Sequence, residues 1–246
     1  MFNSRIILMD AMQKIRSILF AGFWTLWTSL FGLILIGIIA LGSPPKLVRM
    51  CTRLWARGVI FLLKSIVGIT HELSGMEHLP GQPCLIVSNH QSAWETITYL
   101  LFFPEVAIIT KIELLKIPVF GAYLKRSPMI PIDRDAGTKA LRQMVDEGQR
   151  AMEQGRSVLI FPEGTRQAPG TKIEFKRGVE LLYSKLNAPL LPVAMNSGLF
   201  WLPGNQTKRS GVIRVSILPP IPSGMKPQEA IKAAEDQVQT ALNKMV

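Results

Sequence analysis

The chain has 246 residues, a net charge of +11 and a pI of about 10.0. This length suffices for one sizeable hydrophobic core. The positive charge favours anionic partners such as phospholipid head groups, nucleic acid, phosphorylated substrates or acidic proteins. The two cysteines, Cys51 and Cys84, exclude a disulfide framework. We interpret both as reduced and packed, which fits a catalytic domain on the cytosolic side.

A long apolar run dominates the start of the chain. Residues 19–41 contain no charged side chain, and a run of this length can cross the hydrocarbon core, which needs about 20 residues. The alternative is a removable signal peptide, which has a shorter apolar region and a small-residue cleavage site. No such cleavage pattern follows residue 41. We therefore expect a retained membrane anchor.

Cations flank this run on both sides, and more of them follow it, at Lys46, Arg49, Arg53, Arg57 and Lys64. The positive-inside rule predicts that the C-terminal side faces the cytoplasm. Cations on both flanks also suit a helix that enters the membrane shallowly without crossing it. Residues 54–69 form a second apolar stretch, in which Arg57 and Lys64 share one helical face. We expect an amphipathic helix at the lipid interface there; the alternative is an ordinary surface helix that packs on the domain.

From about residue 70 the pattern becomes that of an α/β domain. Apolar runs of strand length occur at residues 84–87, 106–110, 129–132, 158–161, 190–194 and 212–218. One-faced helical patterns occur at residues 138–154 and 227–246. Alternating strands and helices predict an α/β fold with a mostly parallel sheet flanked by helices. We therefore divide the chain into membrane-anchoring helices at residues 1–69 and an α/β domain at residues 70–246.

The segment 89–95, with the sequence NHQSAWE, follows the first expected strand. A neutral histidine at a strand end can take a proton from a hydroxyl, and a carboxylate beside it fixes the imidazole tautomer. His90 and Glu95 can meet in this way if His90 lies in the loop and Glu95 in the first helical turn. The alternatives are a structural role for His90 and a capping box in which Glu95 and Ser92 tie down the helix end.

A second segment, FPEGTR at residues 161–166, ends another expected strand. Gly164 lets backbone amides approach a ligand, Thr165 supplies a hydroxyl, and Arg166 can hold a phosphate through two hydrogen bonds. The glycine spacing is not that of a Walker loop. Further cations follow other strand ends, at Lys111, Arg134 and Lys176. These cations can converge on an anionic group, because parallel strands end at one edge; the alternative for each is a solvated charge.

Other kinds of site find less support. The three histidines have no metal-ligand spacing, and neither cysteine sits in a metal-binding motif, so no metal is expected. The α/β portion lacks the clustered cations and interleaved aromatics typical of nucleic-acid binding. No G-x-S-x-G elbow is present, so a hydroxyl activated by His90 is expected to belong to the substrate.

Four blocks of the sequence resemble those of the glycerolipid acyltransferases, in family order and spacing from about residue 70 to 220. The blocks are NHQS with Glu95, KIEL with Pro118, Gly121 and Ile132-Asp133-Arg134, FPEGTR, and Leu191-Pro192-Val193. The sequence is most similar to the bacterial members that acylate lysophosphatidic acid. It departs from the family at Glu95, where aspartate is usual and some related lipid A acyltransferases have glutamate.

The resemblance implies an acyltransferase domain at residues 70–246. The implied reaction moves an acyl chain from a thioester of acyl carrier protein or coenzyme A to the sn-2 hydroxyl of lysophosphatidic acid, giving phosphatidic acid in phospholipid biosynthesis. No cofactor besides this co-substrate is implied. His90 would be the general base and Glu95 its orienting partner. The residues that would hold the acceptor phosphate are Glu163, Gly164, Thr165 and Arg166, with Arg134 and Lys111.

The implied partners are membrane lipids, lysophosphatidic acid and the thioester donor, and nucleic acid is not among them. The implied location is the inner (cytoplasmic) membrane, with the catalytic domain facing the cytoplasm. Two alternatives stay open. One is an O-acyltransferase for another lyso-lipid, such as a lyso-ornithine lipid. The other is a basic, non-enzymatic protein that binds membrane or nucleic acid.

Overall fold

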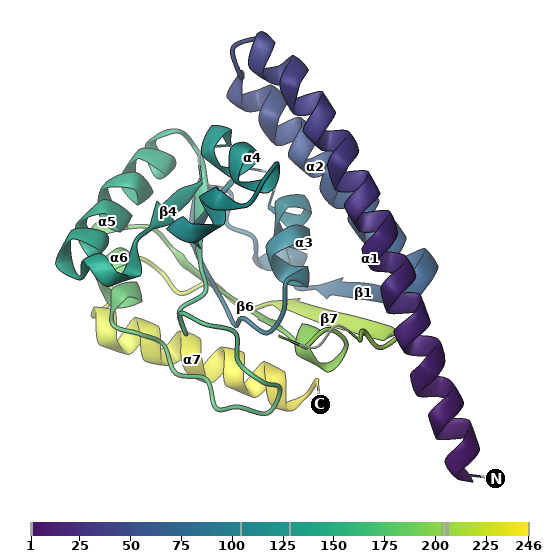
Figure 1. Cartoon of the computed structure of the whole chain (residues 1–246). Coiled ribbons are helices and arrows are strands. Elements are labelled where there is room, and N and C mark those ends of the chain that lie inside the picture. The colour runs from purple at the N-terminus through teal and green to yellow at the C-terminus, as the bar shows by residue number, and fades with distance from the viewer. Residues whose placement is uncertain (1, 104, 128, 203, 205–206, 246) are drawn as a thin grey trace.

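The structure, a computed structural model, describes residues 2–103, 105–127, 129–202, 204 and 207–245. Two helices, α1 (Phe2–Ala40) and α2 (Pro45–Leu62), form a hairpin along one side of the α/β body (Figure 1). The N-terminal end of α1 projects beyond that body. Pro45 begins α2, because its ring holds the φ angle that a first helical turn needs.

The elements that follow are β1 (Ile69–Ser74), β2 (Leu85–Ser88), α3 (Trp94–Phe102), β3 (Val106–Lys111), α4 (Phe120–Arg126), β4 (Ile130–Ile132), α5 (Thr138–Glu153), β5 (Ser157–Ile160), α6 (Gly178–Leu186), β6 (Leu190–Met195), β7 (Gly211–Ile217) and α7 (Pro227–Asn243). Short helical turns occupy Leu63–Val67, Met76–His78, Ile112–Lys116, Arg134–Ala136 and Ser197–Leu199. The six expected strands agree with the observed ones within one residue at each end. Val246, which the last expected helix included, lies outside the described residues.

The strands form one sheet in the order β1-β7-β6-β2-β5-β3-β4. The strands β6, β2, β5, β3 and β4 run parallel to one another, whereas β7 is antiparallel to β6 and parallel to β1. The carboxyl ends of the parallel strands therefore meet at one edge, where open α/β sheets place their chemistry. The expected α/β fold with a mostly parallel sheet flanked by helices is confirmed.

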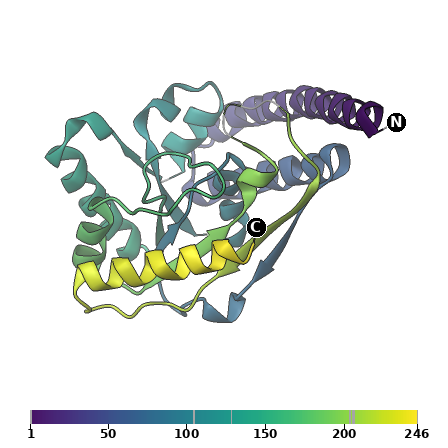
Figure 2. The same ribbon diagram turned by 90° about the horizontal axis from the view of Figure 1, so that it is seen from below.

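Helices cover both faces of this sheet. In β2, Ile86 points into the hydrophobic cluster under α1, α2 and α3, while Leu85 and Val87 point into the cluster under α5, α6 and α7. Figure 2 shows α7 on the opposite side of the sheet from α1 and α2. Because β2 is buried on both faces, it reads as a continuous apolar run without alternation.

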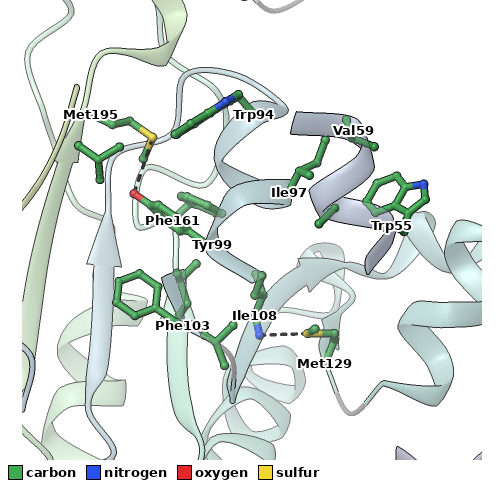
Figure 3. Close-up of a cluster of buried hydrophobic side chains, with 14 of the residues drawn as sticks. Trp55, Val59, Trp94, Ile97, Tyr99, Phe103, Ile108, Met129, Phe161 and Met195 are labelled. Atoms are coloured by element: carbon green, nitrogen blue, oxygen red, sulfur yellow. Dashed lines mark hydrogen bonds between the residues drawn. The ribbon is translucent and has the colours of Figure 1, made fainter. Parts of the chain in front are cut away.

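Aromatic side chains fill the cluster beside α2 (Figure 3). Trp55 and Val59 of α2 lie next to Ile97 of α3. Deeper in the same cluster, the hydroxyl of Tyr99 donates to the sulfur of Met195 at 3.7 Å. The N-terminal helices thus share one core with the sheet.

The bounds expected for the second apolar helix were wrong. In place of residues 54–69, α2 begins at Pro45 and continues as a π-helical turn to Val67. Gly68 closes it with a φ of 82°, a left-handed conformation that glycine adopts without steric cost. Ile69 already belongs to β1.

The two faces of α2 differ. The buried side chains are Val48, Cys51, Trp55, Ala56 and Val59. On the outer side Met50, Leu54 and Phe61 are exposed, and so is Arg57. One face therefore packs on the domain, as the alternative interpretation held, and the other offers apolar surface to its surroundings.

Two further differences concern the N-terminal half. The edge strand β1 was not predicted, because Ile69 is its one buried residue and the others are exposed or half-buried. Helix α1 begins well before the apolar run, at Phe2, and ends at Ala40, one residue before the end of the run. It includes Met9–Ala40, of mean hydropathy 2.0. By length and composition, this is the one segment in the described part of the chain that could cross a membrane.

Candidate active site

The carboxyl edge of the parallel strands carries the residues that the sequence singled out. His90 lies two residues after β2, and Glu163 lies three residues after β5. Lys111 is the last residue of β3, and Arg134 lies two residues after β4. The strand order places β2, β5, β3 and β4 side by side, so these positions follow one another along the edge.

His90 lies in the loop after β2, and Glu95 lies in the first turn of α3. The Nδ1 atom of His90 is 2.8 Å from the Oε1 atom of Glu95. The Glu95 side chain is fully buried, whereas the His90 side chain keeps 15% of its surface exposed. In the neutral tautomer that donates from Nδ1, the Nε2 atom carries the free lone pair. The arrangement can therefore offer a base to a ligand.

The Glu95 carboxylate accepts four further hydrogen bonds. The backbone amides of Gln91 and Ser92 donate to Oε1 at 2.7 and 2.6 Å. The hydroxyls of Ser92 and Ser197 donate to Oε2, each at 2.8 Å. Burial by itself raises the pKa of Glu95, but the hydrogen bond and charge of His90, with the two amides, outweigh it and hold the pKa below its ordinary value. Glu95 is therefore an anion at neutral pH.

Glu95 also takes part in the capping box that was considered as an alternative. The Oγ atom of Ser92 accepts a hydrogen bond from the amide of Trp94 at 2.9 Å, while the amide of Ser92 donates to Glu95. Such a capping box makes Ser92 the expected N-cap, which is wrong by one residue, because Ala93, at φ −81° and ψ −16°, directly precedes the helix. Both roles coexist, since one carboxylate can accept several donors.

The His90 loop is held from the β5 side. The ring of Phe161 stacks on the imidazole, with centroids 4.2 Å apart and an interplanar angle of 20°. The amide of His90 donates to Oε1 of Glu163 at 3.2 Å. The carbonyl of His90 accepts from the amide of Gln167 at 2.7 Å. The β5 loop therefore restrains both the ring and the backbone of His90.

The same loop is held from the β6 side. The Asn89 side chain exchanges two hydrogen bonds with the backbone of Met195, each at 2.9 Å. The Oε1 atom of Gln91 accepts from the amide of Gly198 at 3.1 Å. Together with Ser197, these contacts tie the loop to the strand on its other side. The signal that could have drawn attention to Ser197 is its place two residues after a strand end.

Glu163 is 5% exposed and faces the His90 loop. Burial, with a smaller contribution from the negative charge of Glu95, raises its pKa to about 7, against hydrogen bonds from the backbone amides of Glu163 and His90. Its Oε2 atom is buried with no hydrogen-bond partner among the described residues. The carboxyl is therefore poised to change charge near neutral pH.

Arg134 and Gly164 join the loops after β4 and β5. The Nη1 atom of Arg134 donates to the carbonyl of Gly164. Gly164 has a φ of 75°, and a Cβ added there would lie 2.9 Å from the Nζ atom of Lys176. Two cations therefore flank this glycine, of which Lys176 was noted in the sequence without a firm assignment.

The other expected phosphate ligands lie at exposed positions. Thr165 and Arg166 are exposed on the loop after β5, and Lys111 is exposed at the end of β3. No hydrogen bond or ion pair within the described residues joins Lys111, Thr165 or Arg166 to another side chain. Their role in binding stays a prediction. Across the described residues, no three His, Cys, Asp or Glu side chains form a group that could hold a metal ion.

Comparisons with known proteins define the class. The family model described as Acyltransferase matches residues 70–196. A 1-acyl-sn-glycerol-3-phosphate acyltransferase from Pseudomonas aeruginosa is 36% identical over 211 residues, which cover 86% of this chain and 82% of that protein. The human 1-acyl-sn-glycerol-3-phosphate acyltransferase alpha is 32% identical over 190 residues, which cover 76% and 67% of the two chains.

A solved structure shares the fold. The crystal structure of the 1-acyl-sn-glycerophosphate (LPA) acyltransferase PlsC from Thermotoga maritima matches with a TM-score of 0.77 at 23% identity, over 95% of this chain and 97% of that one. The family model and the Pseudomonas relative show that the chain belongs to the acyltransferase family, as its four sequence blocks indicated.

Proposed function

We propose that the protein transfers an acyl chain from an acyl thioester to the sn-2 hydroxyl of 1-acyl-sn-glycerol-3-phosphate and releases phosphatidic acid. The names of the relatives support this acceptor. The observation that carries the chemistry is the contact of 2.8 Å between His90 and the buried, ionised Glu95. The thioester donor is a derivative of acyl carrier protein or coenzyme A.

In the proposed reaction, the Nε2 atom of His90 takes the proton of the sn-2 hydroxyl as its oxygen attacks the thioester carbonyl. The tetrahedral adduct then expels the thiolate, which recovers the proton from the imidazolium. A C–O bond thus replaces the C–S bond, and no acyl-enzyme forms. Glu95 stabilises the transient imidazolium and keeps Nδ1 protonated throughout.

The acceptor phosphate is proposed to lie over the loops after β3, β4 and β5. The groups that hold it there are Lys111, Arg134, Thr165, Arg166 and the backbone of Gly164. Guanidinium groups suit this role, because they bind a phosphate through two parallel hydrogen bonds. Glu163 is proposed to contribute through the backbone of His90, whose amide donates to it, because the carboxylate form would repel the acceptor phosphate.

Membrane attachment is part of the proposal. The exposed side chains of α1 include Ile18, Leu26, Leu33 and Ile36, each at least 66% exposed. Such a surface favours the apolar interior of a bilayer. We place the protein at the inner (cytoplasmic) membrane, with anchoring helices at residues 1–69 and the acyltransferase domain at residues 70–246 facing the cytoplasm.

The test is a transfer assay with the purified full chain in mixed micelles. Wild-type protein is expected to form phosphatidic acid from lysophosphatidic acid and a labelled thioester. His90→Ala is expected to lower the rate by about 10²- to 10⁴-fold, the usual contribution of a general base. The matched control is His78→Ala, because His78 bonds the carbonyl of Ile217, where the antiparallel strand β7 ends, away from the carboxyl edge.

The same assay separates the alternatives when two donors and two acceptors are crossed. If the protein acylates a lyso-ornithine lipid and does not acylate lysophosphatidic acid, the proposed acceptor is wrong and the lyso-ornithine lipid replaces it. Transfer that survives His90→Ala within a few-fold would remove His90 as the base. Since no cofactor is proposed, a chelator is expected to leave the rate unchanged.

A further inference from the structure

We propose that Ser197 is a positioning residue of this reaction, which holds the Glu95 carboxylate in the orientation that directs it at His90. The inference rests on the proposed function, because it assigns a part in the same proton transfer. Ser197 is fully buried, and its Oγ atom lies 2.8 Å from the Oε2 atom of Glu95. It cannot touch a substrate and can act only through Glu95.

Ser197 differs from the other partners of Glu95 in where it comes from. His90, Gln91 and Ser92 all belong to the loop that precedes α3. These partners move with Glu95 if the loop shifts. Ser197 lies 102 residues further along the chain, after β6. Its hydrogen bond therefore fixes the carboxylate relative to the sheet.

The position of Ser197 is itself well determined. It begins the short turn Ser197–Leu199, and its carbonyl accepts the amides of Phe200 and Trp201 at 3.1 and 3.0 Å. The preceding residue, Asn196, accepts the amide of Arg214 of β7 at 2.8 Å. Backbone and side-chain contacts that do not involve Glu95 thus fix the position of this turn.

The orientation of the carboxylate needs such a restraint. The last side-chain torsion of a glutamate is broad and roughly two-fold, so the side chain alone does not decide which oxygen faces His90. In the structure Oε1 takes the imidazole and two amides, whereas Oε2 takes the two hydroxyls. Without Ser197, Oε2 keeps the Ser92 hydroxyl alone. The carboxylate then loses its hydrogen bond to the turn after β6, and with it one donor that stabilises its negative charge.

The first experiment compares Ser197→Ala and Ser197→Thr with wild type in the transfer assay. By analogy with the outer hydrogen bonds of metal-binding histidines, whose loss costs about 10- to 100-fold, Ser197→Ala is expected to lower kcat by about 10-fold. KM for the acceptor should change little, since Ser197 is buried. Ser197→Thr keeps the hydroxyl and should recover most of kcat.

The matched control is Ser88→Ala. Ser88 is also fully buried, and its hydroxyl lies 2.7 Å from that of Tyr99 and makes no hydrogen bond to Glu95. This substitution removes the same atom from the same region, so a general packing effect would appear in both alanine variants. Thermal unfolding of each variant shows whether it is folded. Equal kcat values for Ser88→Ala and Ser197→Ala would overturn the proposal.

A double-mutant cycle tests whether Ser197 acts through Glu95. In a Glu95→Ala background, adding Ser197→Ala is expected to lower kcat no further, because the partner is already gone. The same fold-loss with and without Glu95 would refute the assignment.

A spectroscopic measurement keeps this inference separate from the proposed function. The chain has three histidines, so the imidazole resonances of 15N-histidine-labelled protein can be assigned with single variants. Ser197→Ala should shift the Nδ1 resonance of His90 and leave those of His71 and His78 in place. That shift would support the positioning role even if wild type acylated no lyso-lipid. An unchanged His90 resonance would refute the role, whatever the activity.

Discussion

The Oε1 atom of Glu163 lies 3.2 Å from the backbone nitrogen of His90, so the loops after β5 and β2 are joined by a buried carboxyl. Burial is the largest cause that raises the pKa of this carboxyl, which reaches about 7. The group therefore changes charge in the range where the proposed base must act. The consequences for stability and for the loop can be measured separately from activity.

The first prediction concerns the stability of the wild type against pH. The pKa of Glu163 rises from 4.5 to about 7 on folding, so the folded state binds more protons than the unfolded state between these values. The free energy of unfolding therefore falls as pH rises through this window. A shift of this size lowers the free energy of unfolding above pH 7 by roughly 3 kcal/mol, relative to its value at acidic pH. Glu163→Gln should remove this dependence, as seen in denaturant unfolding from pH 5 to 8.

The control for this experiment is Glu174→Gln, because Glu174 is an exposed carboxylate in the segment that follows β5. It should keep the pH dependence of the wild type. A wild-type slope that persists in Glu163→Gln would show that another group causes it.

The second prediction concerns the packing of α1 on α2. A Cβ added at Gly58 of α2 would overlap the ring of Trp27 of α1. That ring is fixed, because its Nε1 atom donates to the carbonyl of Trp55 at 3.0 Å. Gly58→Ala should therefore lower the free energy of unfolding by about 1–3 kcal/mol through overpacking. Thermal or denaturant unfolding in detergent measures this loss.

The matched control is Gly22→Ala in α1, where no atom lies within 4 Å of the added Cβ. Alanine favours a helix over glycine by up to about 1 kcal/mol, so this variant should be as stable as wild type or more so. Equal stabilities for Gly58→Ala and Gly22→Ala would contradict the close approach of the two helices.

The third prediction concerns membrane association. Leu26 and Leu33 of α1 are 68% and 67% exposed. If they enter the bilayer, each contributes about 1.5–3 kcal/mol by burial of its side chain. The variant Leu26→Ser with Leu33→Ser should therefore bind vesicles of phosphatidylcholine and phosphatidylglycerol at least about 10-fold less tightly. Co-sedimentation at fixed salt measures the change.

The control is the pair Leu141→Ser and Val212→Ser, which alters exposed apolar side chains of the α/β domain. It removes two such side chains without touching α1. Equal loss of vesicle binding in both double variants would contradict attachment through α1.

Local features of this protein were readable from its residue pattern. The strands β2 and β6 are buried on both faces, so each appears as an unbroken apolar run. The contact between His90 and Glu95 spans five residues, and a helix start between them lets the two side chains meet. The edge strand β1 escaped notice, because an exposed strand leaves no such run.

The amino-acid sequence by itself determined the buried strands, the one-faced helices α5 and α7 and the short-range acid–imidazole contact, since each depends on neighbours within a few residues. The tertiary structure decided which loops surround that contact. Glu163 and Ser197 lie 73 and 102 residues from their partners, and they reach them because β5 and β6 flank β2 in the sheet. Strand order follows from the packing of helices on both faces and from long-range pairing, which no local pattern of residues encodes.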